Sequence, residues 1–129
     1  MARTRLREAR RLLTSGEPSG AYYLAGYAVE CGLKAVIARQ FRNQDIPDKA
    51  LVNRIYTHKL EELVTIAGLA GSLQAQQTAS TAFRLNWRVV SGWSEASRYV
   101  PTSMAVAQDM VRGVGQRNTG VLAWIRTNW

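Results

Sequence analysis

The chain has 129 residues, of which 47% are hydrophobic and 20% are charged, and this balance excludes an intrinsically disordered chain. The length suits one domain with a substantial core and is too short for two. Seventeen Lys and Arg residues against nine Asp and Glu residues give a net charge of +8, which either favours an anionic partner such as nucleic acid, phosphates or an acidic protein, or serves solubility alone.

Residues 4–15 place leucine and alanine side chains at helical spacing and predict the first helix. Its other face carries four arginines, namely Arg3, Arg7, Arg10 and Arg11. These arginines form either a phosphate-contacting surface or a solvated helix face. The basic N-terminal segment lacks the apolar core of a secretory signal, so we expect a cytoplasmic protein.

A second helix is predicted over 21–41, and it is apolar around most of its circumference. Its length approaches that of a membrane span, but a charge at the centre of such a span costs about 2.5–3.5 kcal/mol on insertion scales. Glu30 and Lys34 would both carry that cost, so we expect a buried helix and no membrane partner. The only cysteine, Cys31, lies here, which excludes an intramolecular disulfide and a cysteine-based zinc site.

One narrow stripe of the second helix is polar and aromatic. At about 100° per residue, it is formed by Tyr23, Tyr27, Glu30 and Lys34. The stripe is either the solvated side of the helix, where a Glu–Lys pair contributes only about 0.3–0.5 kcal/mol, or part of a groove or subunit interface. In a groove, the charges would meet groups from other helices and the tyrosines would offer flat faces and hydroxyl groups.

The segment 42–50 is predicted to be a loop, with Asp45 and Pro47 as its turn residues. A third helix is predicted to begin near Thr57, which can act as its N-cap. The glycines of 68–71 end this helix.

A fourth helix is predicted over 73–91, followed by a break or a short helical turn over 92–101. A last helix begins near Thr102, and three glycines in its middle predict a bend or a split. No region alternates apolar and polar residues for long enough to form a sheet. We therefore predict an all-α protein, an up-and-down helical bundle of four to five helices in a single domain over 1–129.

Three segments are informative together, although each is weak alone. They are AYYLAGYAVECGLKA (21–35), YTHKLEEL (56–63) and NWRVVSGWSEASRY (86–99). In their order and spacing, the chain resembles the HEPN domain superfamily, small helical proteins of bacteria and archaea. The resemblance covers the whole chain in helix order and implies a bundle of four or five helices that commonly dimerises.

The resemblance also implies a range of functions. Many HEPN proteins act on RNA, and the ribonuclease members carry an Arg, four to six other residues and then a His, paired across a dimer. Other members have no nuclease motif and work beside a nucleotidyltransferase partner, often in toxin–antitoxin or defence systems, as a helical module that binds a nucleotide or another substrate.

The chain departs from the ribonuclease motif as the family writes it. His58 is the only histidine, and Arg54 precedes it by three intervening residues, one fewer than the pattern. No histidine follows Arg84, Arg88 or Arg98. We therefore expect a module that binds RNA, a nucleotide or a nucleotidyltransferase and is not an enzyme. The alternative is a metal-independent endoribonuclease toxin, with His58 as acid–base and Arg54 or Arg98 stabilising the anion.

The proposed ligand groove is lined by Tyr23, Tyr27, Glu30, Lys34, His58 and Arg98. In it, Lys34 and Arg98 would hold phosphate, Glu30 would orient either of them, and the tyrosines would stack. The alternatives are that His58 is structural, that Arg98 pairs with Glu95 or Glu30, or that the stripe is only a homodimer seam. The histidine, the cysteine and the scattered carboxylates form no ligand set at recognisable spacing, so we expect no metal and no cofactor.

Overall fold

The computed structural model describes residues 1–42 and 48–129, and all regular elements in these two ranges are helices. The predicted turn residues Asp45 and Pro47 lie outside them. In chain order the elements are α1 (Ala2–Thr14), α2 (Pro18–Arg42), α3 (Lys49–Ile55), α4 (Leu60–Ile66), α5 (Ala70–Ala79), α6 (Thr81–Ser91), the 3₁₀ helix η1 (Glu95–Tyr99), α7 (Met104–Gly115) and α8 (Val121–Arg126). The all-α prediction is confirmed, and the helices outnumber the four to five expected.

Two of the additional helices arise because predicted helices divide. The fourth helix divides at Ser80, whose backbone is extended and whose hydroxyl accepts a hydrogen bond from the backbone N–H of Phe83, 3.1 Å away. Ser80 thus ends α5 and caps α6. The last helix divides between α7 and α8, where Asn118 has a left-handed φ of 68°. The predicted split near the three glycines is confirmed.

The helix α3 was not predicted, and it begins at Lys49, inside the segment 42–50 that the sequence assigned to a loop, so the loop prediction is wrong for residues 49 and 50. Its N-cap is Asp48, whose carboxylate accepts a hydrogen bond from the backbone N–H of Ala50 at 3.2 Å. A short helix with no buried residue of its own has no hydrophobic stripe to reveal it in the sequence.

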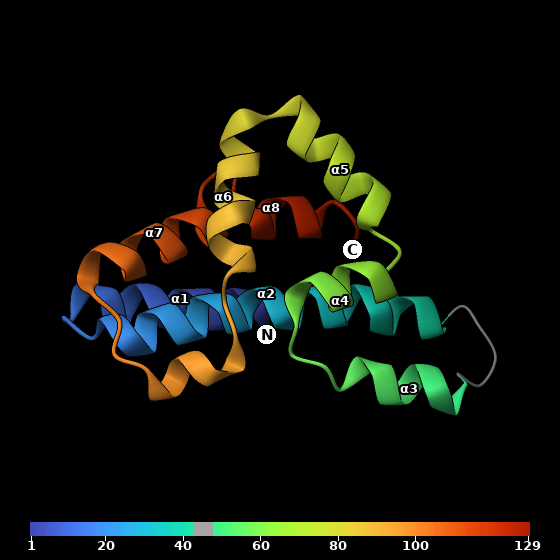
Figure 1. Cartoon of the computed structure of the whole chain (residues 1–129), viewed down its shortest axis with the longest axis horizontal. Coiled ribbons are helices and arrows are strands. Elements are labelled where there is room, and N and C mark those ends of the chain that lie inside the picture. Colours follow the sequence, from blue (N-terminus) through green and yellow to red (C-terminus); the bar gives the residue numbers. More distant parts are fainter. Residues whose placement is uncertain (43–47) are drawn as a thin grey trace.

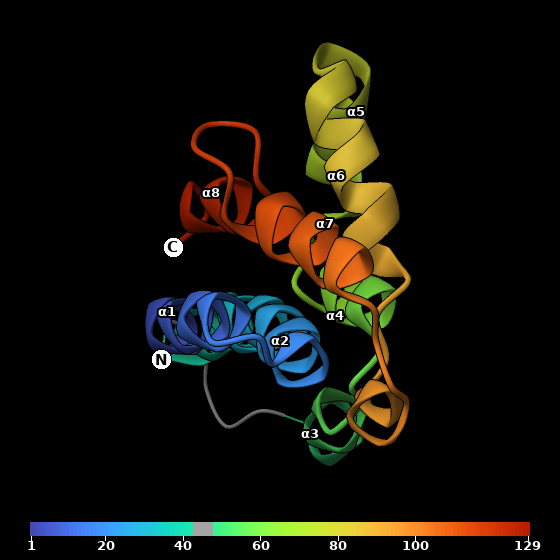
Figure 2. The same cartoon turned by 90° about the vertical axis from the view of Figure 1, so that its left-hand side faces the viewer.

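The long helix α2 is the centre of the fold and contacts α1, α4, α7, α8 and η1. A short loop joins α1 to α2, so the two helices lie antiparallel and side by side, and α6 packs against α7 (Figure 1). Figure 2 shows the α5–α6 hairpin projecting away from this base. No helix within the described ranges is both long and apolar enough to cross a membrane.

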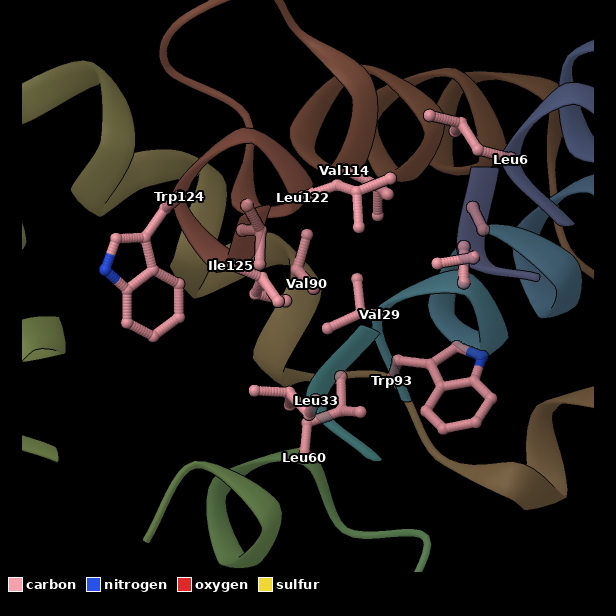
Figure 3. Close-up of a cluster of buried hydrophobic side chains, with 14 of the residues drawn as sticks. Leu6, Val29, Leu33, Leu60, Val90, Trp93, Val114, Leu122, Trp124 and Ile125 are labelled. Carbon is pink, nitrogen blue, oxygen red and sulfur yellow. The ribbon is translucent and has the colours of Figure 1, made fainter. Parts of the chain in front are cut away.

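The core lies between α2 and the helices of the C-terminal half. Figure 3 shows Val29 and Leu33 of α2 directed toward Val90, Val114 and Ile125. All five side chains are fully buried. Burial of each such side chain contributes about 1.5–3 kcal/mol to stability. Because this apolar side of α2 is directed into the core, its other sides face solvent and η1.

Candidate functional site

The structure brings the six residues of the predicted groove together on one side of α2, in two adjoining groups. The first, here called the acid–base cluster, consists of Glu30, Lys34, His58 and, in addition, Glu95. The second, here called the aromatic cluster, consists of Tyr23, Tyr27, Arg98 and, in addition, Trp93 and Tyr99.

Glu30 is the hub of the acid–base cluster. Its Oε1 accepts a hydrogen bond from Lys34 Nζ at 2.9 Å and lies 3.0 Å from His58 Nδ1. On the far side of the imidazole, His58 Nε2 lies 3.3 Å from Glu95 Oε2. The chain of contacts therefore runs from α2 through the segment before α4 to η1.

The side chain of Glu30 is only 3% exposed, so the alternative of a solvated Glu–Lys pair is wrong. A buried carboxylate is tolerated only with counter-charges close by. Here Lys34 and His58 both contact Oε1 of Glu30. The second oxygen, Oε2, is buried without a hydrogen-bond partner in the described structure. Glu30 thus depends on Lys34 and His58 for its burial.

Both ring nitrogens of His58 are engaged by the fold. A neutral imidazole has a single N–H, whereas both ring nitrogens of His58 face carboxylate oxygens. Only the imidazolium form can donate to Glu30 and Glu95 together. The two carboxylates of the cluster thus face Lys34 and the His58 ring. The ammonium of Lys34 is paired within the cluster, which therefore offers no surplus positive charge to a phosphate.

The local sequence explains how His58 reaches Glu30. The helix α4 begins at Leu60, later than the predicted start near Thr57. The Thr57 hydroxyl accepts a hydrogen bond from the backbone N–H of Lys59 at 3.2 Å, and Lys59 is itself extended. The intervening residue, His58, is therefore outside the helix, and its ring turns back onto α2.

Glu95 is held in place by the packing of η1. Two residues earlier, the buried ring of Trp93 lies against Gly26 of α2 so closely that a Cβ atom at Gly26 would overlap it. Glycine is thus required by this close approach. Sequence reasoning assigned Glu95 to no site, and the only available signal was that it is the single acidic residue of the segment 86–99.

The aromatic cluster borders the acid–base cluster along α2. The rings of Tyr23 and Tyr27 are nearly parallel, with centroids 6.1 Å apart. The Arg98 guanidinium lies 5.8 Å from the centre of the Tyr23 ring and 5.2 Å from that of Tyr99. Arg98 forms no ion pair with Glu30 or Glu95, contrary to one alternative, and its contacts are with aromatic rings.

Cys31 and Tyr27 adjoin Glu30 and respond to it. Burial raises the pKa of the Cys31 thiol, and the negative charge of Glu30 adds to that rise while a hydrogen bond with Tyr27 opposes it. The pKa of Tyr27 is also raised, first by the charge of a Cys31 thiolate and then by burial. Both groups are therefore held neutral beside the carboxylate.

Arg54 belongs to neither cluster. It lines a separate hollow with Thr57 and Glu62, and it makes no described contact with His58. The structure therefore does not bring the Arg54 guanidinium and the His58 imidazole together. In the ranges 1–42 and 48–129, no group of three or more His, Cys, Asp or Glu side chains has an arrangement that could hold a metal ion.

Comparisons of the chain with protein-family models, with curated proteins and with solved structures found no match.

Proposed function

We propose that this protein is a HEPN-like helical module that binds RNA without cleaving it. The observation that carries the proposal is the exposed pairing of Arg98 with Tyr99, whose side chain is 76% exposed beside the guanidinium. An aromatic ring can stack on an unpaired base while a neighbouring arginine contacts the phosphate. The all-helical fold is compatible with such a module.

The contacts of the only histidine, His58, favour binding over cleavage. A general acid–base needs a ring nitrogen free to exchange a proton with the substrate, whereas both nitrogens of His58 face carboxylates. An anion-stabilising arginine would also have to lie beside the imidazole, whereas the Arg98 guanidinium lies against the rings of Tyr23 and Tyr99.

The proposal is tested by binding of a fluorescent single-stranded RNA oligonucleotide to the wild type and to Tyr99→Ala. Loss of one stacked base should weaken binding by at least about fivefold. Tyr56→Ala is the matched control, because Tyr56 is 74% exposed but lies outside both clusters. Equal affinities of the two variants would contradict a role for Tyr99, and no binding by the wild type would contradict the proposal itself.

Ribonuclease activity is the second candidate, and one observation favours it. The buried carboxylate of Glu30 holds Nδ1 of His58 at 3.0 Å and so orients the ring, as a carboxylate does in a catalytic triad. The side chain of Glu95 is 47% exposed, and its movement would free Nε2 for proton transfer. RNA cleavage that is lost in His58→Ala and kept in Tyr56→Ala would support this candidate; equal background cleavage would remove it.

A further inference from the structure

A second surface, on another side of α2 from the two clusters, is strongly basic. A hollow of about 500 Å³ lies between α1 and the segment that leads from α7 into α8. Five arginines line it, namely Arg3, Arg7, Arg10, Arg117 and Arg126. Figure 2 shows α1 and α8 on the same side of the molecule, away from η1. We call this hollow the arginine groove.

The arginine groove is part of the packed structure. Arg10 Nη2 donates a hydrogen bond to the backbone carbonyl of Gly115 at 3.0 Å, which joins α1 to the end of α7. A Cβ atom at Gly115 would meet the end of the Arg10 side chain and crowd Leu6, so this glycine lets the end of α7 lie close to α1. The groove therefore exists before any ligand arrives.

The charge of the groove is unbalanced. No carboxylate lines it, and none of its five arginines forms an ion pair with the residues that the structure describes. Neighbouring arginines differ in this respect, since Arg5 pairs with Glu8 at 3.0 Å and Arg112 with Asp109 at 3.5 Å. Clustered guanidinium groups without counter-charges repel one another, and an anionic ligand would relieve that repulsion.

We propose that the arginine groove binds the phosphate backbone of RNA, a proposal that rests on the RNA-binding function above and adds a second contact surface to it. Arg3, Arg7 and Arg10 recur along one side of α1 and span about 10 Å at a rise of 1.5 Å per residue. A row of arginines of that length can contact successive phosphates of one nucleic-acid strand. Guanidinium groups match phosphate oxygens in bidentate geometry.

A lipid surface fits the groove less well. The apolar residues of the groove lie at its floor, where Leu6, Val114 and Leu122 are 7%, 0% and 4% exposed. They offer nothing to insert between acyl chains, as a membrane-binding surface would. The amide groups of Gln116 and Asn118 also line the groove and add neutral donors that suit a sugar–phosphate chain.

The test compares the salt dependence of RNA binding between two triple variants of the full chain. Arg3→Gln/Arg7→Gln/Arg117→Gln removes three groove charges and leaves Arg10 to hold Gly115. The control, Arg39→Gln/Arg84→Gln/Arg88→Gln, removes three exposed arginines that do not line the groove. With about 0.7 counterions released per phosphate of a single strand, the groove variant should flatten the plot of log K against log salt by about 2.

An unchanged slope in the groove variant, or equal slopes in the two triple variants, would overturn the groove as the binding surface. Retention on vesicles containing phosphatidylserine but not on RNA would overturn it in favour of lipid. Tyr99→Ala separates this proposal from the preceding one, because loss of stacking lowers affinity without changing the slope. A groove effect on the slope with no effect of Tyr99→Ala would support the groove alone.

Discussion

The acid–base cluster and the arginine groove hold charge in opposite ways. In the cluster, the buried carboxylate of Glu30 is compensated by Lys34 and His58 within the fold. In the groove, the guanidinium groups have no acidic partner among the described residues and face solvent. The comparison indicates that the charges of the first set compensate one another within the fold, whereas those of the second repel one another.

The largest expected effect follows from removing both cations of the acid–base cluster. Lys34→Met/His58→Leu leaves the Glu30 carboxylate buried without compensation, which should lower the free energy of unfolding by about 3–5 kcal/mol. Urea denaturation monitored by circular dichroism measures this loss in the free energy of unfolding.

The control for that variant adds Glu30→Leu, which removes the buried charge as well. The triple variant should be markedly more stable than the double variant, since no uncompensated ion is left. Equal stability of the two would show that packing rather than charge dominates at this position.

The next effect concerns the contact that positions η1. Gly26→Ala places a methyl group where the ring of Trp93 lies, and overpacking of this kind should cost about 1–3 kcal/mol. In contrast, Gly71→Ala lies in α5 with no neighbour near the new methyl, and should stabilise the protein by about 0.5–1 kcal/mol. Thermal unfolding of both variants is the measurement, and destabilisation of the same size in both would contradict the proposed close contact.

A smaller effect is expected in the arginine groove. The variant Arg3→Gln/Arg7→Gln/Arg117→Gln should change the free energy of unfolding by no more than about 0.5 kcal/mol, with any gain arising from reduced repulsion. A loss of several kcal/mol in urea titration would mean that these arginines stabilise the fold and are not reserved for a ligand.

The smallest effect is a shift in the reactivity of Cys31. Because burial and then Glu30 raise the pKa of its thiol, alkylation by iodoacetamide should reach half its maximal rate at higher pH in the folded protein than in urea. The corresponding stability is present below the unfolded pKa of the thiol and is lost as the pH rises through the folded pKa. Glu30→Gln should move the profile part of the way back, and an unmoved profile would contradict the influence of Glu30.

The sequence predicts helices well where a hydrophobic stripe marks them. The helices α1 and α2 lie within a few residues of their expected bounds because their apolar faces are long and periodic. The helix α3 has no buried residue, and the division at Ser80 depends on one backbone conformation and one capping hydrogen bond. The sequence therefore contains no periodic apolar pattern that would reveal either α3 or the division at Ser80.

The sequence predicted which residues of α2 belong to the candidate site, but not which residues of other elements join them. Helical periodicity places Tyr23, Tyr27, Glu30 and Lys34 on one side, but it says nothing of which distant residues arrive there. Glu95 reaches His58 because the ring of Trp93 lies close against Gly26, a contact between segments remote in sequence. The groove likewise joins Arg7 of α1 to Arg117, which only the packing of α7 brings near.

The hydrogen bond between His58 and Glu30 joins residues 28 apart in sequence, whereas α1 and α2 are joined by a short loop. Closing the longer loop costs more chain entropy and gains nothing until the imidazole arrives. We therefore expect the α1–α2 hairpin to form early during folding and the Glu30 carboxylate to stay hydrated until late. Loss of His58 should then accelerate unfolding while leaving the folding rate nearly unchanged.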